Sequence, residues 1–329
     1  MNYEMFKEVV AVEFENYLPD EYKEAGISIR PFEKINGTKD GIVMNHAPED
    51  GVAPIMYVND LFSKYEESQN LQAVFQSAAT QFMQCMENRE DIKQHINWNT
   101  MRENIVYQLI NTEQNKEFLS NIPHREFQDL SVIYRWVMGL KPEGMESAII
   151  TNTMMEGKFT EEELFQYAQE NTKRILPTKM CSMEEMIREM FGQSGEESIV
   201  DEMIEDFDPQ NAMWVVYNKG KMYGATAILQ EEVLQKLSQK FQGDLYILPS
   251  SLHETIVVSA EGKDPYELAE MVAEINMSQV ELEDRLSNQV YHYDKDLRTI
   301  SMATDTPVKR LDGQVAEPDM SYGSKEVSR

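Results

Sequence analysis

The last third of the chain alternates pairs of short strand-like segments with single amphipathic helices, and this order limits the possible folds. Strand pairs are expected at 213–217 with 223–229, at 243–259 around a loop, and at 289–293 with 297–302, with helices at 233–241 and 264–276 between them. Strands joined by short turns pair in antiparallel fashion, whereas successive parallel strands need a crossover. The order β-β-α-β-β-α-β-β therefore predicts an α+β fold with a mainly antiparallel sheet, and not a Rossmann alternation.

Turn and cap residues support these boundaries. The segment Asn218-Lys-Gly-Lys221 places a glycine in the turn of the first strand pair. Gly243 is expected to be the C-cap of the helix before it, and Asp264 followed by Pro265 is a typical helix start. Earlier in the chain, Thr160 and Glu163 have the spacing of a capping box, which predicts a helix beginning at Thr160.

The first half of the chain is predicted to be richer in helix. Helices are expected at 6–18, 54–65 and 70–89, and strands at 27–32, 41–44, 104–110, 130–138 and 147–151. Pro19 should end the first helix, and Pro31 restricts its segment to a sheet edge or a strand end, because proline cannot donate a ladder hydrogen bond.

Composition divides the chain into four regions. They are an N-terminal α+β region at 1–175, an acidic Met-rich helical segment at 176–209, a C-terminal α+β domain at 210–303, and a tail at 304–329. The helical segment holds ten acidic residues and one basic residue between Glu184 and Asp208. The tail is polar and has no apolar period, so it is predicted to be disordered.

The acidic segment carries two amphipathic stripes that could bind a partner. The candidate interaction residues are Met183, Met186, Met190, Phe191, Met203 and Phe207. Methionine is flexible and polarizable, so such a stripe suits an adaptable binding groove, although stripes of this kind more often belong to a core.

The formal net charge is −28, from 58 acidic and 30 basic residues. A field of this sign repels phosphate backbones and anionic membrane surfaces, so we expect no direct nucleic-acid binding and no membrane association. The acidic excess suits either solubility or a basic protein partner. The first residues lack the pattern of a signal peptide, and the two cysteines form no disulfide framework, so the cytoplasm is the expected compartment.

The segment between two apolar runs, Leu248-Pro-Ser-Ser-Leu-His-Glu254, holds residue types that occur in hydrolase active sites. Its weak catalytic candidates are Ser250, Ser251, His253 and Glu254. A serine nucleophile needs a base within reach, and the chain has no G-x-S-x-G sequence. Ser251 and Glu254 also have capping-box spacing, which favours a structural turn. Phosphate loops and metal-ligand spacings are missing from the sequence, so no cofactor and no metal are expected.

Several segments of the chain are similar to a family of uncharacterised proteins from clostridial gut bacteria. The C-terminal ones are Gly243-Asp-Leu-Tyr-Ile-Leu-Pro-Ser-Ser-Leu-His-Glu254, 273–276 and Leu286-Ser-Asn-Gln-Val-Tyr-His-Tyr-Asp294, and the earlier ones are 54–65 and 163–172. The resemblance extends over residues 1–303, and a more distant similarity of arrangement links the chain to an uncharacterised family of bacilli. It implies a bacterial, intracellular chain of a single family, and it implies no activity or functional residues.

Three hypotheses on function remain open at this point. The first is a non-enzymatic protein-interaction module that acts through its acidic, Met-rich segment. The second is a hydrolase-like enzyme with a site near Ser250, Ser251, His253 and Glu254. The third is an acidic inhibitor that mimics nucleic acid, which needs carboxylates spaced like phosphates on one face.

Overall fold

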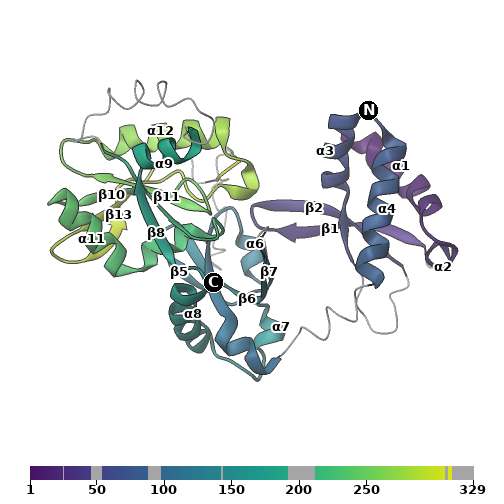
Figure 1. Cartoon of the computed structure of the whole chain (residues 1–329), viewed down its shortest axis with the longest axis horizontal. Coiled ribbons are helices and arrows are strands. Elements are labelled where there is room, and N and C mark those ends of the chain that lie inside the picture. Colours follow the sequence, from purple (N-terminus) through teal and green to yellow (C-terminus); the bar gives the residue numbers. More distant parts are fainter. Residues whose placement is uncertain are drawn as a thin grey trace, which may run out of the picture. The chain divides into compact units, whose positions relative to one another are not determined.

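The computed structural model describes residues 1–24, 26–45, 54–87, 98–141, 144–191, 212–307 and 310–312. The chain forms two compact units, Met1–Glu103 and Asn104–Arg329 (Figure 1). The boundaries predicted at 175 and 209 fall inside the second unit. The described part of the chain has three antiparallel sheets with helices beside them, which confirms the α+β class.

The first unit places helices on one face of a three-stranded sheet. Its elements are α1 (Tyr3–Glu13), the 3-10 helix η1 (Phe14–Tyr17), α2 (Asp20–Lys23), β1 (Ile27–Lys34), β2 (Gly37–Met44), β3 (Met56–Tyr57), α3 (Val58–Ser68) and α4 (Leu71–Glu87). The strand order is β1-β2-β3, so β1, which holds Pro31, is an edge strand as predicted. The helix expected from Pro54 begins later, at Val58, because Met56 and Tyr57 pair with β2 first.

An aromatic cluster fills the core of the first unit. The rings of Phe6, Phe14 and Tyr17 each meet Phe75 of α4 at centroid distances between 5.3 and 6.1 Å. Phe6, Phe14 and Phe75 are fully buried. Edge-to-face pairs of this kind stabilise a core by about 0.5–1.5 kcal/mol each beyond the burial of apolar area.

The second unit begins with a four-stranded sheet. The 3-10 helix η2 (Trp98–Asn104) crosses the boundary between the units. The elements that follow it are β4 (Ile105–Asn111), α6 (Lys116–Leu119), β5 (His124–Phe127), β6 (Leu130–Lys141), β7 (Gly144–Ile149) and α7 (Asn152–Met155). The strand order is β4-β6-β5, and β7 also pairs with β6. Helix α8 (Glu161–Ile175) packs on β4 and has the predicted capping box, with the Glu163 N–H 3.2 Å from Thr160 Oγ1 and the Thr160 N–H 2.8 Å from Glu163 Oε2.

A six-stranded sheet completes the second unit, in the order β13-β12-β10-β11-β9-β8. Its strands are β8 (Thr178–Ser182), β9 (Trp214–Asn218), β10 (Leu245–Leu248), β11 (Glu254–Ser259), β12 (Tyr291–Asp294) and β13 (Thr299–Met302). The helices are α9 (Met183–Phe191), the 3-10 helix η4 (Gly224–Leu229), α11 (Glu231–Phe241), α12 (Pro265–Gln279) and the 3-10 helix η5 (Leu282–Asp284). The predicted hairpin at 289–302 is confirmed as β12 and β13, and Asp264 is the N-cap of α12 as predicted.

One predicted strand pair is wrong. The segment expected as a strand at 223–229 is the 3-10 helix η4, and β9 pairs with β8 and β11 instead. The reason lies in the turn that follows β9, where the side chain of Asn218 donates to the Met222 carbonyl and its Oδ1 accepts from the Met222 N–H at 3.3 Å. Tyr223 then adopts a left-handed conformation with φ 56°, which turns the chain away from β9.

Two smaller predictions also need correction. The residue that ends α11 in the left-handed conformation is Gln242, with φ 56°, and not Gly243. Disorder does not begin at Thr304, because Thr304 is 2% exposed and Leu311 is fully buried. The N–H of Leu311 donates to the Gln114 side chain at 3.1 Å, while residues 313–329 lie outside the described part.

In the ranges that the structure describes, no helix is long and apolar enough to cross a membrane.

Candidate functional site

The loop Pro249–His253 is held by backbone hydrogen bonds to the segment that follows η5. The carbonyl of Pro249 accepts from the Ser287 N–H at 2.8 Å, and the carbonyl of Ser250 accepts from the Leu286 N–H at 2.9 Å. The Leu252 N–H donates to the Asp284 carbonyl at 2.8 Å. The predicted structural turn therefore exists, and a partner segment more than thirty residues later fixes it.

The capping box predicted at Ser251 and Glu254 is only half right. Ser251 Oγ accepts a hydrogen bond from the His253 N–H at 3.0 Å, two residues ahead, as in a serine turn. Glu254 instead begins β11, where it pairs with Tyr217 of β9. The serine hydroxyl thus stabilises the backbone of the loop.

Both ring nitrogens of His253 have partners other than serine. Nδ1 lies 3.4 Å from the Tyr223 N–H, and Nε2 lies 3.0 Å from Asp284 Oδ1. The hydrogen bond to Asp284 raises the pKa of His253 above its ordinary value, and burial opposes only part of this change. A serine hydrolase needs a ring nitrogen directed at the serine hydroxyl, and this geometry gives His253 a different task, which is to join the loop to η5 and η4.

A stack of side chains continues from His253 into the unit. The Tyr223 ring lies over the imidazole at a centroid distance of 6.1 Å and an interplanar angle of 27°. The guanidinium of Arg135 in β6 lies 4.9 Å from the centroid of the Tyr223 ring. Arg135 also donates to Ser147 Oγ at 2.9 Å and to Gln108 Oε1 at 3.1 Å. The stack therefore links the two sheets of the second unit by cation–π and hydrogen-bond contacts.

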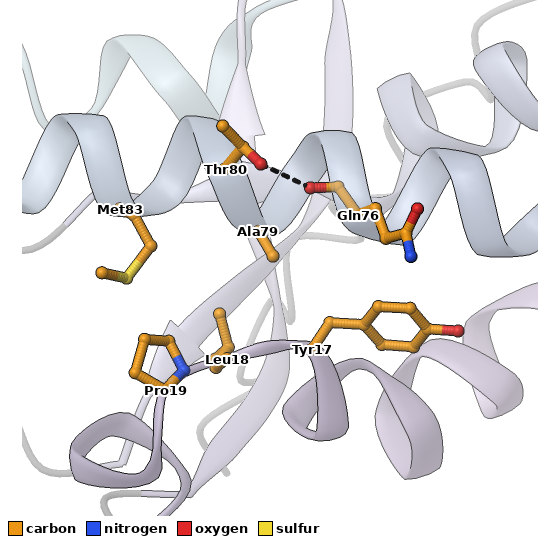
Figure 2. Close-up of a pocket in the computed structure, with 7 residues that line it drawn as sticks. All are labelled: Tyr17, Leu18, Pro19, Gln76, Ala79, Thr80 and Met83. Carbon is orange, nitrogen blue, oxygen red and sulfur yellow. Dashed lines mark hydrogen bonds between the residues drawn. The ribbon is translucent and has the colours of Figure 1, made fainter.

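A hollow of about 440 Å³ lies in the first unit, between the segment after α1 and helix α4. Figure 2 shows Tyr17, Leu18 and Pro19 on one side of it and Ala79 and Met83 of α4 on the other. Thr80 is engaged with its own helix, since its hydroxyl donates to the Gln76 carbonyl at 2.9 Å. None of the described residues that line the hollow has a charged side chain.

A groove of the second unit lies between the strands β8 and β9 and the helix α9, with a volume of about 550 Å³. Strand residues Lys179, Cys181 and Tyr217 line it together with Glu185, Arg188 and Glu189 of the helix; Thr178 and Met180 complete the lining. Burial raises the pKa of the Cys181 thiol, which a hydrogen bond with Tyr217 partly offsets, so the sulfur stays protonated at neutral pH. Cys181 is therefore a poor nucleophile.

Within the described residues, strand β8, which borders this groove, has one side without a partner strand, which we call its open side. β8 is the last strand of its sheet. The Lys219 N–H donates to the Pro177 carbonyl at 3.1 Å and the Met183 N–H to the Met213 carbonyl at 2.9 Å. Backbone N–H and C=O groups alternate in direction along an antiparallel strand. Those that point away from β9 therefore belong to Thr178, Met180 and Ser182. Ser182 uses its N–H for the Glu185 carboxylate at 2.9 Å, which leaves Met180 at the centre of the open side.

The predicted interaction residues are placed unequally. Met183 and Met186 are half-buried on α9, and neither is among the residues that line the groove. Of Met190 and Phe191 only the helical backbone is described, and Met203 and Phe207 lie outside the described residues. β8 was not predicted, because Thr178-Lys-Met-Cys-Ser182 shows no alternation of polar and apolar residues. Tyr217 was predicted as a strand residue but not as part of a site.

Among the described residues, no group of three or more His, Cys, Asp or Glu side chains is close enough to hold a metal ion.

Comparison with known proteins identifies one related group. A family model described as a family of unknown function, DUF5688, matches residues 3–295. No curated protein and no solved structure matches the chain.

Proposed function

The chain belongs to the DUF5688 family of unknown function, and from its own geometry we propose that it is a non-enzymatic protein-interaction module that binds an extended, basic segment of a partner. The observation that carries the proposal is the open side of β8 next to the groove under α9. An extended segment can add to such an edge by backbone hydrogen bonds, while alternate side chains enter the neighbouring groove. A bacterial, cytoplasmic setting is part of the proposal, supported by the resemblance to clostridial proteins.

The net charge of the chain favours a basic partner. Glu185 and Glu189 line the groove from α9, and Glu184 lies on the same helix. Arg188 and Lys179 also line the groove, so its local charge is nearly balanced, while the whole chain carries −28. A Lys or Arg side chain near Glu189 is therefore attracted at short range by this carboxylate and at long range by the net charge.

The backbone part of the proposal is tested by Met180→Pro. Proline at this position removes the outward N–H and leaves the bonds of Lys179 and Cys181 to β9 in place. The probes are blocked synthetic peptides of alternating Val and Lys, or alternating Val and Glu, titrated by calorimetry. We expect the Val-Lys peptide to bind more tightly, and Met180→Pro to weaken it by about tenfold, since a hydrogen bond is lost and a ring is added at the edge.

A second pair of variants tests the charge. Glu189→Gln should weaken the Val-Lys peptide by about threefold, because an exposed charge pair contributes about 0.2–1 kcal/mol. Glu184→Gln is the matched control, since it removes the same charge from the same helix outside the groove lining. Equal binding of the two peptides, or a Met180→Pro variant that folds and binds like the original chain, would refute the proposal.

A further inference from the structure

The outer face of the sheet in the first unit carries a group of cationic and aromatic side chains. We call it the cationic face and define it by Arg30, Phe32 and Lys34 of β1, Lys39 of β2 and Tyr57 of β3. These residues lie opposite Ile27, Ile29, Ile42, Met44 and Met56, which pack against the helical core. Because side chains alternate between the two faces of a strand, the cationic face points away from the helical core.

Contacts between side chains confirm that this face is one continuous surface. The Tyr57 ring lies 6.4 Å from Phe32, with Lys34 Nζ 4.5 Å and Lys39 Nζ 6.0 Å from the Tyr57 centroid. Gly41 lies beneath the Phe32 ring, since a Cβ at this glycine would come within 2.6 Å of two ring carbons. The glycine therefore lets the Phe32 ring lie close to the strand backbone.

The acidic side chains of these strands point elsewhere. Asp40 accepts hydrogen bonds from Tyr3 Oη at 2.8 Å and Lys7 Nζ at 2.6 Å on α1, so it belongs to the helical side. Glu33 accepts from the Thr38 hydroxyl at 3.2 Å. Lys39 has an ion pair with Asp60 at 3.1 Å, but Arg30 is exposed and has no ion pair within the described residues. In a chain of net charge −28, this sorting leaves one sheet face locally positive.

Apolar side chains extend the same face. Ile55 is 40% exposed, and its Cγ2 lies on the outer side of Gly41, where an added Cβ would meet it at 2.8 Å. Val43 shares this side of β2 and is half-buried. A ligand for this face must therefore offer both negative charge and apolar groups.

We propose that the cationic face binds an acidic, partly apolar segment of a partner protein. Carboxylates of the segment pair with Arg30 and Lys34, and its apolar side chains cover Ile55 and Phe32. Single-stranded nucleic acid fits this face less well, because its bases stack on aromatic rings that lie parallel to them. Here the rings of Phe32 and Tyr57 meet edge-on at 81°, and Lys34 covers the Tyr57 ring. The net charge of the chain also repels a polyphosphate more strongly than a short peptide.

The test uses the full chain and three fluorescently labelled probes, which are a short peptide of alternating Glu and Leu, its Lys–Leu counterpart and an oligothymidine. Fluorescence anisotropy should show binding of the Glu–Leu peptide in preference to the other two. Arg30→Glu should weaken this binding by about tenfold, since it replaces an attraction by a repulsion. Lys64→Glu is the matched control, because Lys64 is an exposed cation on α3 outside the cationic face.

The apolar contribution has its own control. Ile55→Asn should weaken the Glu–Leu peptide, whereas Val12→Asn, at a residue of α1 that is 75% exposed, should not. Circular dichroism confirms that each variant is folded. Tighter binding of the oligothymidine, equal losses with Arg30→Glu and Lys64→Glu, or no binding of the acidic peptide would overturn the proposal. The groove beside β8 belongs to the other unit, so either proposal can fail while the other holds.

Discussion

Gly224 is the position where a single added methyl group should be most damaging. A Cβ there would lie 2.9 Å from the Asn218 nitrogen and 3.0 Å from the Tyr217 Cα, and closer still to the His253 carbonyl oxygen. All three are backbone atoms, which cannot rotate away as side chains do. Gly224→Ala must therefore push η4 from β9 and from the His253 loop, and it stretches the hydrogen bond between the Ala225 N–H and the Leu252 carbonyl.

The size of the effect follows from these contacts. Overpacking costs about 1–3 kcal/mol, and rigid backbone neighbours favour the upper end of that range. A weakened backbone hydrogen bond adds about 1 kcal/mol. We therefore expect the free energy of unfolding of the second unit to fall by about 3–4 kcal/mol, which is a large share of the about 5–15 kcal/mol typical of a domain.

Urea unfolding measures this loss through the fluorescence of Trp136 and Trp214, both of the second unit. The midpoint should shift by about 1–4 M urea, given typical urea slopes of about 1–3 kcal/mol/M. Gly243→Ala is the control, because the nearest atom to its added Cβ is at 3.9 Å. It should leave the midpoint unchanged or raise it slightly. A Gly224→Ala variant as stable as the Gly243→Ala variant would refute the reasoning about η4.

Two further predictions concern stability. Asp284 raises the pKa of His253 above 6.5, so the pair stabilises the fold in full below pH 6.5 and loses this contribution as pH rises through the folded-state pKa. The difference in melting temperature between the original chain and His253→Gln should therefore shrink from acidic to alkaline pH. A difference that stays constant with pH would contradict this prediction. Thr160→Ala removes the capping box of α8 and should cost about 1 kcal/mol in urea unfolding, with Thr160→Ser retaining most of the stability; equal losses in both variants would argue against the cap.

Elements with local signals were predictable from the sequence. The starts of α8 and α12 depend on hydrogen bonds between residues two or three positions apart, such as the bond from the Tyr266 N–H to Asp264. The hairpin of β12 and β13 closes through the Asp294 carboxylate, which accepts from the N–H groups of the next residues. All the information for these elements lies within one turn of chain, so residue types and spacing suffice.

Elements with distant partners were not predictable in the same way. β8 pairs with β9 across a long stretch of chain. The segment 223–229 had the composition of a strand but could not pair with β9, because β8 and β11 occupy both edges of β9. The same holds for the loop at Ser250 and Ser251, where a turn was expected but its partner, the segment at Leu286, was not. A single sequence shows which residues favour extended backbone, and it does not show which edge remains open to them.

The contacts between the first and last segments of the second unit bear on the order of folding during synthesis. Asn111 donates to the Leu286 carbonyl at 3.2 Å, and Asp129 accepts from Ser287 at 2.6 Å and from Tyr291 at 2.5 Å. A nascent chain that emerges from the ribosome can complete the unit Met1–Glu103 early, because the contacts that define this unit lie within residues 1–103. The buried amide of Asn111 must wait until residue 286 has been made. In the unit Asn104–Arg329, the sheet that emerges first is therefore exposed to misfolding for longest. Chaperone binding should be strongest to chains stalled between residues 111 and 286.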